Sequence, residues 1–212
     1  LDNGTVVAWG ANNLRQLGGN TDKMSGAGEA YATTPRVVMR GENTDDQQTT
    51  GKADPHFDLR GIMAISAGDR FSLVETEGHK ALRFGSFTSR DGVTSVTVYH
   101  PVYVKEAGAT NAAAPTVIEK VQSIAAGSYH GVAATGTLAN HDTAVWAWGL
   151  NTSGQLGNGF ATNDDAMNTR VDAEMNATEV VSPVENYTPH TIYESDVIQV
   201  SAGSGHSVLY KQ

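Results

Sequence analysis

The stretch that decides the fold is AVWAWGLNTSGQLGNG, residues 144–159. Its first five residues alternate small or aliphatic with aromatic side chains, the two-residue period of a strand buried on both faces. Gly149 ends this predicted strand. The polar loop behind it should turn sharply, because glycine adopts torsions that other residues reach only at a cost. Its glycines are Gly154, Gly157 and Gly159. Leu156 interrupts this loop and is expected to pack back onto the core.

The same stretch recurs earlier in the chain, and we call its strand the C strand. Residues 5–19, TVVAWGANNLRQLGG, repeat it most clearly. The matching residues are Trp9, Gly10, Gln16, Leu17 and Gly18 against Trp148, Gly149, Gln155, Leu156 and Gly157. A weaker copy is ALRFGS at 81–86, in which Phe84 and Gly85 take the Trp-Gly positions and no Gln-Leu-Gly follows.

A second motif alternates with the C strand and predicts a pair of short strands, A and B. It occurs at 62–74, 121–134 and 197–210, each time as two apolar runs around a small-small-Gly turn. The turn glycines are Gly68, Gly127 and Gly203. His130 and His206 follow the turn in two copies, and Phe71 takes that place in the first. A fainter echo, a proline before a short strand, predicts a D strand at 34–38, 100–104 and 182–184.

The order of motifs predicts an all-β array of four-stranded propeller blades over residues 1–212. The repeats run from about 1 to 76, 77 to 136 and 137 to 212, which gives two whole blades and two terminal half-blades. Polar insertions are predicted at 19–33, 41–58, 105–118 and 158–181. We expect Trp9, Phe84 and Trp148 to be buried at equivalent C-strand positions. The turns at Gly68, Gly127 and Gly203 should converge near the propeller axis.

These motifs resemble the regulator of chromosome condensation repeat family, in three copies of which the second is degenerate. The resemblance implies a β-propeller, of about seven blades in most members. One departure is Arg15, which stands where the third copy has Gly154, so that this turn must differ or carry strain.

The two half-blades are complementary in sequence. Joining the end to the beginning gives HSVLYKQ–LDNGTVVAWG, which reads as a B–C hairpin with a turn at Asp2-Asn3-Gly4. Three units are too few to close a ring, so both sheet edges should be met from outside. Either further blades of a longer chain or neighbouring copies could supply them. The chain starts at Leu1 and not at Met, which agrees with an excerpt or a processed form.

Composition excludes several function classes. The formal charge is −9 and the 14 Lys and Arg are scattered, which argues against a nucleic-acid partner. No apolar run is long enough for a membrane span. The chain has no Cys. Together with its many Asn, Thr and Ala residues and its long insertions, this favours an extracellular or cell-surface protein, while a cytosolic origin stays open.

The sequence contains no catalytic constellation, cofactor motif or metal-ligand spacing. His130 and His206 recur at one blade position and are interpreted as packing residues. Aromatic residues within polar insertions have no role in a strand pattern, so Phe57, Phe160, Tyr187 and Tyr193 are the candidate contacts for a protein partner.

The first hypothesis is therefore a non-enzymatic scaffold that presents loops to another protein. The family resemblance gives the alternative, nucleotide exchange on a Ran-type GTPase. No segment of this sequence matches the wedge that exchange requires, and a fold alone does not establish a function. An enzymatic role, a lyase or glycosidase on a propeller, is the third possibility and has the least support in the residues.

Overall fold

The computed structural model describes residues 4–19, 30–41, 58–88, 92, 95–105, 117–136, 143–157, 178–179, 181–182, 190–191 and 197–211. Every regular element in them is a β-strand, which confirms the predicted all-β class. All pairings between strands are antiparallel.

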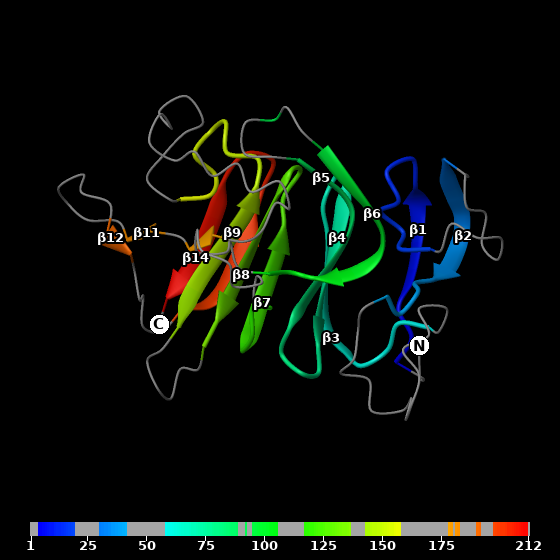
Figure 1. Cartoon of the computed structure of the whole chain (residues 1–212), viewed down its shortest axis with the longest axis horizontal. Coiled ribbons are helices and arrows are strands. Elements are labelled where there is room, and N and C mark those ends of the chain that lie inside the picture. The colour runs from blue at the N-terminus through cyan, green and yellow to red at the C-terminus, as the bar shows by residue number, and fades with distance from the viewer. Residues whose placement is uncertain are drawn as a thin grey trace, which may run out of the picture.

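Two four-stranded sheets form the centre of the molecule (Figure 1). The first runs in the order β3 (Ile62–Ala67), β4 (Phe71–Thr76), β5 (Ala81–Thr88) and β6 (Ser95–Tyr103). The second runs β7 (Val121–Ala126), β8 (His130–Thr135), β9 (Ala144–Gly149) and β10 (Thr178–Glu179). In both sheets the spatial order equals the chain order, as in a blade with strands A, B, C and D.

A two-stranded sheet flanks each side of this pair. On one side β1 (Val7–Ala11) pairs with β2 (Tyr31–Val37), the C and D strands of a half-blade. On the other side β13 (Val197–Ala202) pairs with β14 (Ser207–Lys211), an A–B hairpin. A short hairpin of β11 (Val181–Ser182) and β12 (His190–Thr191) lies away from the blades in Figure 1.

The third D strand differs from its prediction. The proline pattern predicts that residues 182–184 pair with the C strand, but β9 pairs with Thr178 and Glu179 instead. Ser182 pairs with His190 in the separate β11–β12 hairpin. The run around Pro183 lacks the apolar alternation that fixes a register, so the proline alone was a weak guide to the pairing.

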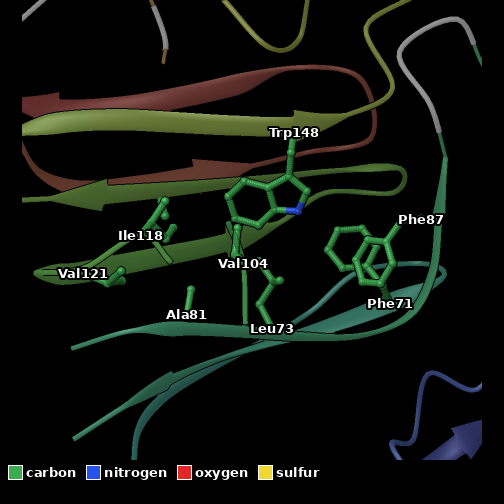
Figure 2. Packing of buried hydrophobic residues seen from close by; sticks show 9 residues of the cluster. Phe71, Leu73, Ala81, Phe87, Val104, Ile118, Val121 and Trp148 are labelled. Atoms are coloured by element: carbon green, nitrogen blue, oxygen red, sulfur yellow. The ribbon is translucent and has the colours of Figure 1, made fainter. Parts of the chain in front are cut away.

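Each hydrophobic core lies between two successive sheets. The largest cluster packs Leu73 and Ala81 of one blade against Val121, Ala133 and Trp148 of the next (Figure 2). A second cluster, around Leu156, Val197 and Val200, joins the next pair of sheets. A third lies between the first half-blade and the first whole blade and contains Val38, Leu59, Val74, Leu82 and Phe84. The sheets are thus held together by the apolar faces that they present to one another.

The A strands of neighbouring sheets lie side by side. The amide of Ala126 on β7 donates to Ser66 Oγ on β3 at 2.9 Å, and the amide of Val200 on β13 donates to Ser123 Oγ at 3.1 Å. The turn glycines also meet, because a Cβ on Gly68 would strike the Gly127 carbonyl and one on Gly127 would strike that of Gly203. The A strands therefore form the inner edges of the blades.

Trp9 does not follow the burial predicted for the three equivalent C-strand aromatics. Phe84 and Trp148 are 2% and 1% exposed, but Trp9 is 63% exposed. The reason is that β5 and β9 each pair with a B strand, whereas the inner edge of β1 has no strand partner among the described residues. The prediction of a buried Trp9 is wrong for this chain taken alone.

Candidate functional site

The loops after β1 and β9 have the same internal geometry. In the first, Asn12 Oδ1 accepts from the Leu17 amide and Gln16 Oε1 from the Leu14 amide. In the second, Asn151 Oδ1 accepts from the Leu156 amide and Gln155 Oε1 from the Ser153 amide. Both glutamines are buried, so their side chains serve the loop and are not offered to a ligand.

The turn at Arg15 has the same backbone conformation as the turn at Gly154 in the third copy, and this conformation is strained for a residue with a side chain. Its φ is 64°, next to 72° for the equivalent Gly154, so a residue with a Cβ occupies the left-handed region here. The guanidinium lies over the Tyr99 ring, with 5.6 Å from Cζ to the ring centroid. Of the two outcomes that the sequence left open, the structure shows strain and not a different turn.

A hydrogen-bonded bridge joins the second whole blade (β7–β10) to the β13–β14 hairpin, and we call it the His–Ser–Gln bridge. His130 Nε2 on β8 lies 2.9 Å from Ser207 Oγ on β14. Ser207 Oγ donates to the backbone oxygen of Gln155 at 2.8 Å. Since the hydroxyl proton is directed to Gln155, the imidazole must be the donor to Ser207, which requires a proton on Nε2.

Burial keeps the imidazole of this bridge uncharged. His130 is fully buried, and desolvation lowers its pKa below the usual value of a histidine. The ring also lies against Gly127, where a Cβ would collide with it. The recurring glycine and histidine of the A–B motif are therefore explained by packing and by a structural hydrogen bond.

Half of this bridge is present at the first joint between blades. Ser72 Oγ on β4 donates to the backbone oxygen of Gln16 at 2.9 Å, as Ser207 does to Gln155. Ser72 and Ser207 occupy the same position of the repeated motif, directly after the Phe71 and His206 positions. Among the described residues, no histidine is hydrogen-bonded to Ser72.

The joint between the two whole blades is built differently. Gly131 replaces the serine, Phe71 replaces the histidine, and the segment after β5 lacks Gln-Leu-Gly. The pairing of β5 with β6 continues instead as far as Thr88 and Ser95. Phe87 from β5 packs against Phe71, with 4.9 Å between the ring centroids (Figure 2). At this joint, aromatic contacts therefore replace the polar contacts of the other joints, and all three positions change together.

The A–B turns and the starts of the C–D loops share one end of the blades. The Leu150 amide donates to the Tyr129 carbonyl at 3.0 Å, and the Ser86 amide to the Arg70 carbonyl at 2.9 Å. Arg70 stacks over Tyr129 at 4.6 Å, and Ser128 Oγ donates to Ser204 Oγ at 3.3 Å.

A pair of acid and imidazole groups lies between blades at the opposite end. His79 Nδ1 is 3.2 Å from Glu75 Oε1 and 3.1 Å from the Val121 carbonyl. Burial raises the pKa of Glu75, while the hydrogen bond to His79 partly offsets that rise. The described part of the chain places no three His, Asp or Glu residues close enough to hold a metal ion.

The inner edge of β1 borders an apolar groove of about 350 Å³. Trp9 and Ala8 of β1 line one side, and Ile65 and Gly68 line the other. Ile65 is 70% exposed, although Val200 at the same position of β13 is 5% exposed. Large apolar residues at repeat positions buried elsewhere mark a contact surface.

The outer edge of β14 is the counterpart of that groove. Val208, Leu209 and Tyr210 are 56%, 38% and 57% exposed. The equivalent residues of β8 are at most 2% exposed, because they pack against the sheets on either side of their own. The equivalents are Val132, Ala133 and Ala134. Both edges of the array thus display backbone and apolar side chains that the whole blades bury.

The four predicted partner contacts lie outside the described residues. They are Phe57, Phe160, Tyr187 and Tyr193. The structure instead brings together His130 and Gln155, which the repeats mark, with Ser207, which the sequence analysis did not mark; the three are far apart in the chain. The sequence did carry a signal for this contact, because three positions change together between copies. Where Phe71 replaces the histidine, Gly131 replaces the serine and the Gln-Leu-Gly loop is missing.

The described sheets therefore define a β-propeller protein, seen as successive blades joined through their faces. Residues 142–210 match the regulator of chromosome condensation (RCC1) repeat. This match confirms, for the third unit, the resemblance carried by its Trp-Gly, Gln-Leu-Gly and small-Gly motifs.

Solved structures of RCC1-family proteins share the fold. Human WBSCR16 matches with a TM-score of 0.56 and 16% identity over 99% of this chain and 40% of that one. Prp20p from Saccharomyces cerevisiae matches with a TM-score of 0.50 and 19% identity over 98% of this chain and 40% of its own. Yeast RCC1 (Prp20) bound to Kap60 gives 0.51 and 21%, over 99% and 38%.

The chain spans about two fifths of the length of these relatives. At such identities the likeness establishes the fold and not the activity. A comparison with curated proteins gives no significant match. Within the described residues, no helix is long and apolar enough to cross a membrane.

Proposed function

We propose that this chain is a non-enzymatic scaffold that binds another protein through loops displayed on propeller blades. The observation that carries the proposal is that the repeated polar residues make hydrogen bonds between blades. His130, Ser207 and Gln155 hold one blade to the next and lie within the framework. This leaves the variable insertions as the parts that can differ between partners.

The framework supports recognition at a defined end of the molecule. The described residues that bound the insertion 19–33 are held together, since the Asn12 amide donates to the Ala30 carbonyl at 2.7 Å. The solved relatives also bind proteins: Prp20p has binding properties to Gsp1p and histones, and yeast RCC1 was solved with Kap60 bound to it. Rigid strands that position loops are a common basis for such binding.

Alanine substitution of the loop aromatics tests this proposal. Partners captured by proximity labelling and pull-down with the intact chain are compared with those captured after Phe57→Ala, Phe160→Ala, Tyr187→Ala and Tyr193→Ala. We expect loss of at least one partner. Tyr31→Ala is the matched control, since Tyr31 is 64% exposed but belongs to a strand. Unchanged capture by all four variants would contradict the proposal.

The second candidate function is nucleotide exchange on a Ran-type GTPase. The fold likeness to Prp20p favours it, since that protein has binding properties to Gsp1p. Release of labelled GDP from Ran-type GTPases, with and without this chain, is the measurement. A rate raised several-fold would support exchange, and an unchanged rate would leave the scaffold role.

We also propose an extracellular or cell-surface location. The absence of Cys and the abundance of Asn and Thr in the insertions support this placement. Protease accessibility of a tagged chain on intact cells, compared with lysed cells, tests it directly.

A further inference from the structure

The first whole blade has an open edge on its outer side. In the sheet order β3, β4, β5 and β6 the A strand is innermost, and β6 borders no further strand among the described residues. Successive blades meet through their faces, so a neighbouring blade does not cover this edge. With nine residues β6 is longer than the other outer strands β2 and β10, which have seven and two.

The backbone groups of β6 point alternately toward β5 and away from it. The Ser86 amide of β5 donates to the Arg70 carbonyl on the side of β4, so the next residue, Phe87, faces β6 and pairs with Val96. Val96 therefore directs its amide and carbonyl inward, and Thr97 directs them outward. The outward-facing residues in this part of the strand are Ser95, Thr97 and Tyr99. Among the described residues, none pairs with their backbone groups.

Other parts of the outer edges are protected against pairing. Proteins block open strand edges with proline, with short strands or with a covering segment. The strand β2 contains Pro35, which has no amide proton, and β10 is only two residues long. At the far end of β6, a Cβ on Gly41 would strike the backbone of Pro101, so residue 41 lies directly against the strand there. Residues 95–99 contain no proline and no charged side chain.

Apolar side chains are exposed on both faces of this unprotected stretch. Val96 is 39% exposed and Tyr99 is 43% exposed. Because side chains alternate along a strand, these two residues lie on opposite faces of the sheet. The guanidinium of Arg15 lies over the Tyr99 ring, 5.6 Å from its centroid. A strand added beside β6 would thus find a side chain to contact on each of its faces.

The charges beside this edge are positive, although the whole chain has a formal charge of −9. The strands β1, β2, β5 and β6 contain two arginines and no Asp or Glu. Further cations flank them: Arg15 lies over Tyr99, and Lys80 Nζ lies 5.5 Å from the centroid of the Tyr103 ring. Lys105 follows the end of β6. A local excess of positive charge favours an acidic partner.

We propose that residues 95–99 of β6 bind an extended acidic segment of another protein, which adds to the sheet as a further strand. The outward amides and carbonyls of Ser95, Thr97 and Tyr99 pair with the backbone of this segment. Val96 and Tyr99 contact its side chains, and Arg15 attracts its carboxylates. This binding site goes beyond the proposed recognition by loops, because it uses strand residues and none of the loop aromatics. The two proposals can therefore fail independently.

Binding of a short synthetic peptide to the whole chain tests the site. The probe is fluorescein-labelled Asp-Val-Glu-Val-Glu-Val-Asp with capped ends, and fluorescence anisotropy measures its affinity. We expect saturable binding. A control peptide with Lys in place of every Asp and Glu should bind at least about tenfold more weakly, as should one with N-methylated valines, which cannot donate backbone hydrogen bonds.

Two substitutions in the chain test the site from the other side. Thr97→Pro removes one outward amide and leaves the inward amides of β6 in place, so peptide affinity should fall about tenfold or more. Thr33→Pro, at an exposed position of the other outer strand β2, is the matched control and should bind the peptide as the wild type does. Thermal melting followed by circular dichroism checks that both variants fold.

Arg15→Gly gives a second variant that does not endanger the fold. Glycine relieves the left-handed strain at this position, as Gly154 does in the equivalent turn, so stability should not fall. Loss of the guanidinium should nevertheless weaken binding of the acidic peptide about 3- to 10-fold. Equal affinity of this variant and the wild type would contradict the role assigned to Arg15.

Hydrogen exchange locates the bound peptide. Exchange should slow in residues 95–99 when the acidic peptide is added. Absence of binding, equal binding of the lysine peptide, or an unchanged affinity of Thr97→Pro would each overturn the proposal. Slowing confined to other segments would overturn it as well. Peptide binding that persists in Phe57→Ala, Phe160→Ala, Tyr187→Ala and Tyr193→Ala would show that the strand site is separate from the loops.

Discussion

Single side chains decide how tightly the blades fit, and equivalent positions need not contribute equally. Trp148 is buried between the two whole blades, above Val104 and beside Phe71 and Phe87 (Figure 2). Trp9 occupies the same motif position and is exposed. The energetic value of this repeated position therefore depends on whether a B strand lies beside it.

Trp148→Ala should lower the free energy of unfolding by about 3–5 kcal/mol, since it empties a large buried site. Trp9→Ala should change it by no more than about 0.5 kcal/mol, since Trp9 is exposed. Urea unfolding followed by circular dichroism measures both changes. Equal losses would contradict the environments described for the two residues.

His130 gives stability a dependence on pH. Its pKa is lowered in the folded protein, so the unfolded chain binds the proton more readily and stability falls as pH drops below about 6.5. Glu75, whose pKa is raised, acts in the opposite direction: its contribution to stability is present below its ordinary pKa of about 4.3 and is lost as pH rises above it.

We therefore expect unfolding free energy to decrease from pH 7.5 to pH 5.5, and His130→Gln to flatten that slope while lowering stability at pH 7.5. Urea titrations at several pH values are the measurement. His100→Gln, at an exposed position on β6, serves as control and should keep the slope. A wild-type slope of zero would argue against a buried neutral imidazole.

At the scale of elements, joints between sheets matter as much as the sheets. The first and third joints use a serine hydroxyl and a Gln-Leu-Gly loop, and the middle joint uses Phe71, Phe87 and a glycine. Both solutions fill the same space between a C–D hairpin and the following B strand.

Ser207→Ala should reduce stability by about 1–2 kcal/mol, because it leaves the Gln155 carbonyl and the buried His130 without their hydroxyl. Ser204→Ala, in an exposed turn, should cost little. Denaturant midpoints of the two variants and of the wild-type chain measure the difference. Similar midpoints would mean that the bridge adds nothing to the joint.

The sequence predicted the elements well because the period of two and the small-Gly turns are local signals. It also predicted the all-β class and the order of strands within a blade. It failed where a long-range partner decides: Trp9 is exposed for want of a neighbouring strand, and β9 pairs with Thr178–Glu179 and not with the proline-marked run. The His–Ser–Gln bridge was missed for the same reason, since it joins three distant segments.

At the scale of the whole molecule, stability is distributed unevenly. The two four-stranded sheets share the largest core, whereas within the described part of the chain β1–β2 and β13–β14 each pack against one neighbouring sheet. Cooperative units with few buried contacts open at lower free energy.

Hydrogen exchange should accordingly show slow amides in β4, β5, β8 and β9 and faster ones in β1 and β14. Mass spectrometry of the exchanging chain makes the comparison. Uniform exchange in all strands would contradict the described distribution of the core.

The alternation of joint types also limits how such an array can evolve by recombination. Deleting the first whole blade, β3–β6, would set the Gln16 loop against Gly131, which has no hydroxyl to donate. Deleting the second whole blade, β7–β10, would set Ser207 against the end of β5, which no Gln-Leu-Gly follows in the sequence. Each unit therefore fits only particular neighbours, and a gene for this chain can gain or lose blades without loss of stability only when matching joints are exchanged together.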